Sequence, residues 1–81
     1  TLKIRLNGPI NILTDAYKQM MNDVKPNGKP YIEHKIKDIA KFICDNYLDE
    51  NGNELSMLTI QTYLSPTRTD KNPNNDWKIK L

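Results

Sequence analysis

The sequence predicts a small α+β domain resembling a winged helix-turn-helix, with three helices and a small antiparallel sheet formed by the terminal strands. Three observations support this prediction. Both ends of the chain alternate apolar and basic residues, which is the period of a half-buried strand. Two stretches between them space apolar residues by three and four, which is the period of a helix. A third, shorter stretch begins with a good N-cap.

The first strand is expected over Leu2-Lys-Ile-Arg-Leu6, and Asn7-Gly8-Pro9 should end it. A helix is then expected from Ile10 to Asn22. Its apolar positions fall on one stripe, which should face the core. These positions are Leu13, Ala16, Tyr17, Met20 and Met21.

The middle of the chain predicts a loop and a second helix. Residues 24–30 hold two prolines and an Asn-Gly pair, which favour turns. Residues 31–33 are expected to form a very short strand, and residues 34–47 the second helix. Residues 48–55 read as a turn longer than that of a minimal helix-turn-helix. The apolar positions of the second helix are Ile36, Ile39, Ala40, Ile43 and Tyr47.

The third helix is expected at about residues 56–65, with Ser56 as its N-cap and Pro66 preventing continuation. It should dock on the second helix through its apolar side. Residues 65–76 read as a flexible loop, and residues 77–81 as the second strand, paired with the first. The side chain of Trp77 should fill the small core, or pack over the third helix as part of the wing. The residues expected in the helix contact are Ile39, Ile43, Leu58, Ile60 and Leu64.

Length and composition limit the classes to which this protein can belong. With 81 residues the chain has room for one domain, residues 1–81, with a marginal core. Its 12 basic and 10 acidic residues give a net charge of only +2, so any patch that binds nucleic acid must be local. The lone Cys44 and the lack of a membrane-spanning or signal segment favour a soluble, cytoplasmic protein. The chain starts at Thr1, which fits a trimmed segment or the C-terminal module of a longer protein.

The free face of the third helix suggests duplex DNA as a partner. Small hydroxyls and an amide can approach base edges or phosphates, as on the second helix of a helix-turn-helix. If both terminal strands lay beside this helix, Lys3, Arg5 and Lys80 would add to a basic patch that could hold phosphates. The expected DNA-binding residues are Met57, Thr59, Gln61, Thr62, Ser65, Arg68, Lys71 and Lys78.

Two other interpretations fit the same residues. The third helix could simply complete a three-helix core with its threonines in water, and the strand lysines could serve solubility and blunt a sheet edge. A protein-interaction domain could use the same helix and wing to hold another chain. Salt dependence of binding distinguishes DNA from a protein partner.

The sequence offers no catalytic, metal or cofactor site. Residues 49–54 are rich in oxygen ligands, but an EF-hand register starting at Asp49 places Glu54 at the glycine position and Ile60 at the glutamate position. His34 is the only histidine, so a two-histidine metal site or a triad cannot be assembled. Cys44 reads as a half-buried hydrophobe without a histidine base on its helix face. We therefore expect a non-enzymatic protein.

Four short motifs in the second half of the chain carry a resemblance to known proteins. They are Asp38-Ile-Ala-Lys-Phe-Ile43, Asn51-Gly-Asn-Glu-Leu-Ser56, Thr59-Ile-Gln-Thr-Tyr-Leu-Ser-Pro-Thr-Arg68 and Asp70-Lys-Asn-Pro73. With these motifs the chain resembles a group of small Bacteroidota proteins, whose ends resemble the helix-turn-helix portion of the RteC regulators carried by conjugative elements. The resemblance covers roughly residues 30–81, and it implies a cytoplasmic DNA-binding or element-regulating role. The chain lacks most of the N-terminal portion of a full-length RteC regulator. The contact positions that the resemblance implies are Met57, Thr59, Gln61, Thr62 and Arg68.

Overall fold

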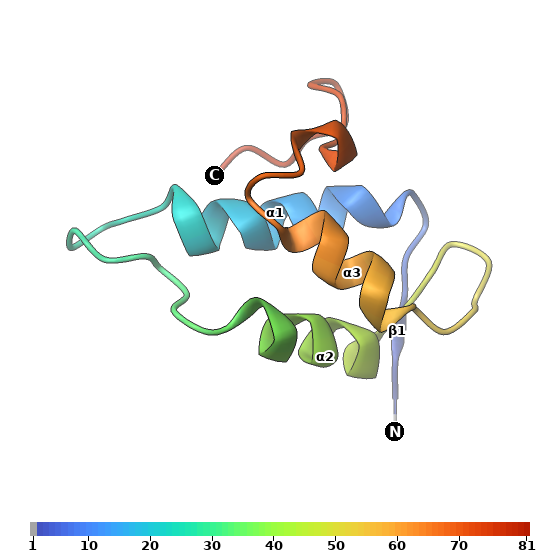
Figure 1. Ribbon diagram of the computed structural model, residues 1–81. Coiled ribbons are helices and arrows are strands. Elements are labelled where there is room, and N and C mark those ends of the chain that lie inside the picture. Colours follow the sequence, from blue (N-terminus) through green and yellow to red (C-terminus); the bar gives the residue numbers. More distant parts are fainter. Residues whose placement is uncertain (1) are drawn as a thin grey trace.

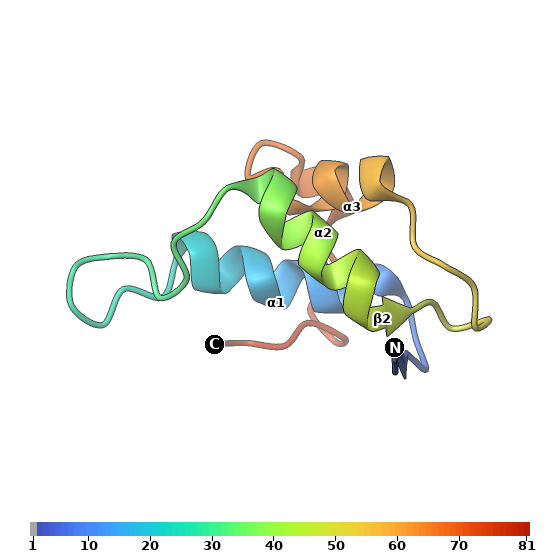
Figure 2. The ribbon, with the colours of Figure 1, turned by 90° about the horizontal axis from the view of Figure 1, so that it is seen from below.

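The computed structural model describes residues 2–81 as three α-helices, two very short strands and a 3₁₀ turn. The elements in chain order are β1 (Ile4–Arg5), α1 (Ile10–Asn22), α2 (Ile36–Asn46), β2 (Tyr47–Leu48), α3 (Met57–Leu64) and η1 (Thr69–Lys71). In Figure 1, α3 lies obliquely between α1 and α2, and the C-terminal segment returns along α1. Figure 2 shows the three helices from below, with α2 running directly into β2.

The first two helices lie close to where the sequence predicts them. Helix α1 has the predicted bounds, and Pro9 precedes its first turn in an extended conformation. Helix α2 is shorter than the predicted 34–47, because Lys35 is extended at its start and Tyr47 is extended at its end. The chain therefore leaves α2 directly into β2.

The third helix confirms its predicted cap. The Thr59 N–H donates to Ser56 Oγ over 3.4 Å, which satisfies one of the free donors of the first turn. At the other end Ser65 is extended, as expected for a residue that precedes a proline. Local sequence signals thus determine both ends of α3.

The core lies where α3 packs against both other helices. Ala40 and Ile43 of α2 are fully buried against Ile60 and Leu64 of α3. Ile39 packs against this cluster from α2, and residues of α1 pack against it as well. The expected contact between α2 and α3 is confirmed. Helices α1 and α2 make far fewer contacts with each other than either makes with α3.

The predicted core role of Leu58 is wrong. Its side chain is 73% exposed, whereas Met57 packs against the core. Residues three and four apart share a helix face, so Met57 lies on the side of Ile60 and Leu64. Leu58 is two residues from Ile60 and therefore points away from it.

The predicted antiparallel sheet of the two terminal strands is also wrong. Strand β1 instead pairs in parallel with β2, with Ile4 opposite Tyr47 and Arg5 opposite Leu48. Residues 77–81 form no strand. The Lys78 N–H donates to the Asn74 carbonyl in a turn, and the backbone further on bonds to a side chain of α1 rather than to β1. The wing of a winged helix is therefore missing from the described chain.

Two smaller predictions, the short strand at residues 31–33 and the core role of Trp77, are also wrong. Residues 31–33 form no strand, and residues 31 and 32 are bends in the chain. The Tyr31 N–H donates to the Val24 carbonyl and the Ile32 N–H to the Met20 carbonyl, so this segment folds back onto the end of α1. Trp77 is 62% exposed and does not fill the core. In the part of the chain that the structure describes, no helix is long and apolar enough to cross a bilayer.

The contrast between Ile60 and Leu58 gives a test of how α3 docks. Ile60→Ala should lower the free energy of unfolding by about 2 to 5 kcal/mol, because it empties a fully buried site. Leu58→Ala on the same helix should change it by less than about 0.5 kcal/mol, because that side chain is in solvent. Urea unfolding followed by circular dichroism measures both. Equal effects of the two substitutions would contradict this packing.

Candidate functional site

Helix α3 exposes only part of the face predicted to bind DNA. Thr59 is exposed, and Gln61 and Thr62 are half-buried. Met57 is also half-buried and packs against the core, so its side chain serves the fold. Ser65 is half-buried, and its hydroxyl lies 3.0 Å from that of Thr67. The hydroxyl-lined face is therefore narrower than the sequence suggests.

The basic residues that follow α3 are paired with the chain's own carboxylate. Arg68 Nε donates to Asp70 Oδ1 over 3.1 Å, and this hydrogen bond lowers the pKa of the Asp70 carboxyl and raises that of the guanidinium. Lys71 Nζ lies 3.8 Å from Asp70 Oδ2 and 5.9 Å from the centre of the Tyr63 ring. The Asp70 carboxylate offsets part of the positive charge that these two cations would offer to a phosphate.

Three further members of the predicted basic patch are engaged elsewhere, whereas Lys80 is exposed. Lys78 Nζ lies 3.8 Å from Oδ2 of Asp15, which is only 4% exposed. Lys3 pairs with the Glu54 carboxylate, and the Arg5 guanidinium donates to the Glu50 carbonyl over 2.8 Å. The expected patch depended on terminal strands paired beside α3, and these strands do not pair.

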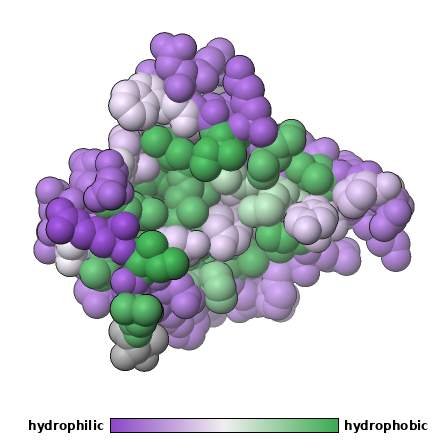
Figure 3. All heavy atoms as spheres, turned by 180° about the vertical axis from the view of Figure 1, so that it is seen from behind, coloured by the Kyte–Doolittle hydropathy of each residue, from purple (hydrophilic) through white to green (hydrophobic). Residues whose placement is uncertain are grey.

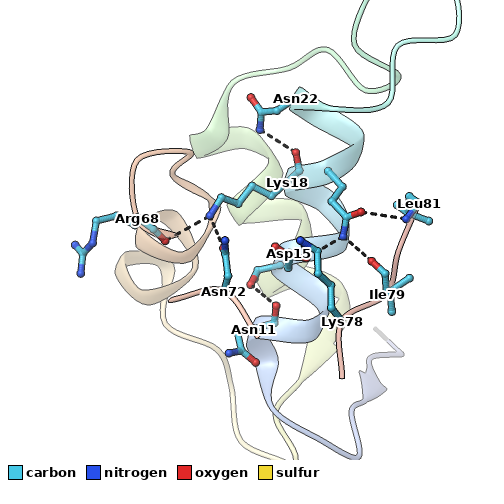
Figure 4. A network of polar contacts seen from close by, with 11 residues as sticks. Asn11, Asp15, Lys18, Asn22, Arg68, Asn72, Lys78, Ile79 and Leu81 are labelled. Atoms are coloured by element: carbon cyan, nitrogen blue, oxygen red, sulfur yellow. Dashed lines mark hydrogen bonds and ion pairs between the residues drawn. The ribbon is translucent and has the colours of Figure 1, made fainter. Parts of the chain in front are cut away.

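A buried polar strip on α1 holds the C-terminal segment, as Figure 4 shows. Gln19 Nε2 donates to Asp15 Oδ2 over 2.8 Å and to the Ile79 carbonyl over 2.5 Å. Gln19 Oε1 accepts from the Leu81 N–H over 3.0 Å. The side-chain amide thus binds an extended backbone much as a neighbouring strand would.

Lys18 extends this strip toward the loop after α3. Its Nζ donates to Asn72 Oδ1 over 2.7 Å and lies 3.4 Å from the Arg68 carbonyl (Figure 4). A polar hollow of about 190 Å³ adjoins these residues. Every buried side-chain nitrogen and oxygen in the described part of the chain has a partner, so the strip serves to fasten the segment. Sequence reasoning missed it, because the polar face of an amphipathic helix is ordinarily assigned to solvent.

The role of Gln19 can be tested by removing its amide. Gln19→Ala should cost about 1 to 3 kcal/mol, because the buried Asp15 carboxylate loses a donor and the C-terminal backbone loses two hydrogen bonds. It should also speed the hydrogen exchange of the Leu81 amide, which can be followed by NMR. Gln61→Ala, a matched glutamine substitution on α3, should change neither quantity appreciably. Unchanged exchange at Leu81 in Gln19→Ala would contradict the fastening role.

The other distinctive surface is apolar and lies around β1. Leu2 is 90% exposed and Ile4 is 58% exposed. Figure 3 shows hydrophobic atoms gathered across the face opposite to that of Figure 1 and reaching toward the N-terminal strand. A groove of about 290 Å³ lies beside the end of β1. Its lining residues are Leu6, Asn7, Gly8, Pro9, Ile12, Leu13 and Ile79.

The titratable groups offer little chemistry. Among the described residues, no cluster of histidine, cysteine and carboxylate side chains could hold a metal ion. His34 lies at the surface, with Nδ1 3.0 Å from Asp38 Oδ2. Burial raises the pKa of the Cys44 thiol, and the neighbouring Asp45 carboxylate raises it further, so the thiolate is disfavoured at neutral pH. These side chains serve the surface and the packing of α2.

Comparison with models of protein families, with curated proteins and with solved structures found no match. The resemblance to RteC regulators therefore stays a prediction. Whether the residues assigned to DNA contact a duplex likewise stays a prediction.

Proposed function

We propose that this chain is a non-enzymatic protein-interaction domain that binds an extended segment of a partner at the free edge of β1. The observation that supports this best is the open edge itself: β1 has a single neighbour, β2, in the described sheet. Exposed strand edges bind extended chains through backbone hydrogen bonds. A cytoplasmic location, which the free Cys44 suits, is part of this proposal.

The hydrogen-bond pattern of β1 supports the edge as a binding surface. The Leu6 N–H donates to the Leu48 carbonyl over 3.1 Å, so Leu6 directs its backbone toward β2. Successive residues of a strand direct their backbone groups to opposite edges. Arg5 therefore presents its N–H and C=O groups at the edge away from β2, where a further strand could bind. Lys3 precedes the two-residue strand and would do the same once pairing extends it.

The side chains around this edge add an apolar surface. Alternation along the strand places Leu2 and Ile4 on the same face as Leu6, which lines the groove. The basic side chains of Lys3 and Arg5 point toward the turn at residues 49–54, where they are bound. A partner strand could thus add backbone bonds at the edge and place an apolar side chain in the groove.

A capped pentapeptide of alternating valine and threonine provides a direct test. Titrated into labelled protein, it should shift the NMR amide signals of Lys3, Arg5 and the groove residues. The same peptide with proline at its centre should bind at least about tenfold more weakly, because it lacks a backbone donor and distorts the strand. Leu58→Lys, placed on α3, should leave binding unchanged. No shifts with either peptide would overturn the proposed function.

Duplex DNA is a second candidate partner. It is supported by the capped helix α3, by its exposed Thr59 with Gln61 and Thr62 nearby, and by the resemblance to RteC regulators. The internal pairing of Arg68 and Lys78 weighs against it, because phosphate contacts supply most of the affinity of such complexes. The apolar edge is therefore the favoured surface.

The DNA candidate makes its own prediction for substitutions. If it holds, Arg68→Ala should weaken binding to all duplexes alike and reduce the salt slope by about one contact. Gln61→Ala should lose about 1 to 3 kcal/mol on a preferred site and little on other sequences. Fluorescence anisotropy with random duplex at two salt concentrations measures the first effect. No binding at low salt would remove DNA as a partner.

A further inference from the structure

We propose that the segment which adds to the edge of β1 is the β1 strand of a second copy of this chain, in antiparallel orientation with Ile4 opposite Ile4. This inference rests on the strand-addition function proposed above and names its partner. The resulting dimer would join the short sheets of both copies into one sheet across a two-fold axis.

The pattern of residues around Ile4 is chemically symmetric. Reading outward from Ile4, both directions give a basic residue and then a leucine, in Leu2-Lys-Ile-Arg-Leu6. An antiparallel strand of the same sequence, centred on Ile4, therefore places apolar residues opposite apolar ones along its length. A two-fold interface requires such self-complementarity.

The backbone of β1 fits the same register. Arg5 of β1 directs its N–H and C=O groups to the free edge, as the Leu6 bond to Leu48 implies, and Lys3 would do so once pairing extends this two-residue strand. With Ile4 opposite Ile4, Lys3 of each copy lies opposite Arg5 of the other. That is a hydrogen-bonded pair in an antiparallel ladder, so each pair exchanges both of its backbone bonds.

The charges on the other face of β1 are compensated within each copy. The register brings Lys3 of one copy near Arg5 of the other, and like charges directly opposite each other are destabilising. Lys3 already carries the Glu54 carboxylate as its ion partner, and Arg5 is bound to the Glu50 carbonyl. The adjoining turn at residues 49–54 holds three carboxylates, which offset the two cations of each strand.

The groove gives the most exposed apolar side chain a place to bind. Leu2 of one copy lies opposite Leu6 of the other, and Leu6 lines the groove with Ile12 and Ile79. Pairing would thus cover a leucine that is 90% exposed and an isoleucine that is 58% exposed. Pairing of two short strands buries less than the roughly 1,200 Å² total of a stable interface, so we expect a dissociation constant of about 10 μM to 1 mM.

Charge substitution at the two-fold axis tests this register. Sedimentation of the full chain between about 10 μM and 1 mM should show a monomer–dimer equilibrium. Ile4→Lys and Ile4→Glu should each weaken dimerisation by about tenfold or more, because each places like charges opposite one another. An equimolar mixture of the two variants should restore it, because the pair then carries opposite charges.

The matched controls are Leu58→Lys and Leu58→Glu, which change an even more exposed side chain on α3 and should leave dimerisation unchanged. Failure of the mixture to restore dimerisation would overturn the Ile4-centred register. A wild-type chain that stays monomeric at 1 mM but binds the valine-threonine peptide would overturn the second copy as partner and leave the strand-addition function standing. If the wild-type chain neither dimerises nor binds the peptide, both proposals fail.

Discussion

The rest of the structure depends on the burial of Ile60 and Leu64 of α3. These two side chains close the core against Ala40 and Ile43, and α1 packs onto the same cluster. Because α1 and α2 make little contact with each other, α3 is what holds them in one structure. A chain this short has few such residues, and removing one side chain takes a large share of its stability. The positions of β2 and of the turn at residues 49–54 follow, because both continue directly from α2.

A second set of contacts, which is polar, holds the C-terminal segment on α1. These contacts explain why the segment does not form a strand. Gln19 offers a carbonyl and an amide at the spacing of a peptide group, and it binds the backbone on both sides of Lys80. Lys78 Nζ lies beside Asp15, which is on the same face of α1 as Gln19. Burying these groups is tolerable only because they bind one another, and a polar contact deprived of its partner costs more than it contributes when complete. The segment is therefore held by α1, and β1 keeps an open edge.

The features that the sequence predicted correctly are local ones. The bounds of α1 follow from a periodic stripe after Pro9, and those of α3 from Ser56 and Pro66, all within a few residues of the helix ends. Strand partners are distant in the sequence, and alternation does not distinguish one possible partner from another. The tail alternates as a strand would, yet the Gln19 amide binds its backbone. The predicted DNA-binding residues stay a prediction, but sequence alone could not reveal that Lys78 lies beside the buried carboxylate of Asp15, which is far away in the chain.

Several cations of this protein are paired within the chain, whereas two apolar side chains near its start are exposed to water. Arg68, Lys78 and Lys3 have partners within the chain, whereas Leu2 and Ile4 are left in water at an unpaired edge. Natural sheets commonly protect such edges with proline, a bulge or charges that point along the edge. Strand β1 is only two residues long, which itself limits such pairing, but it contains no proline, and the side chain of Arg5 turns toward the 49–54 turn. An edge left open in this way either pairs with unrelated chains or has a partner of its own. The symmetry of the sequence about Ile4 favours a partner of its own.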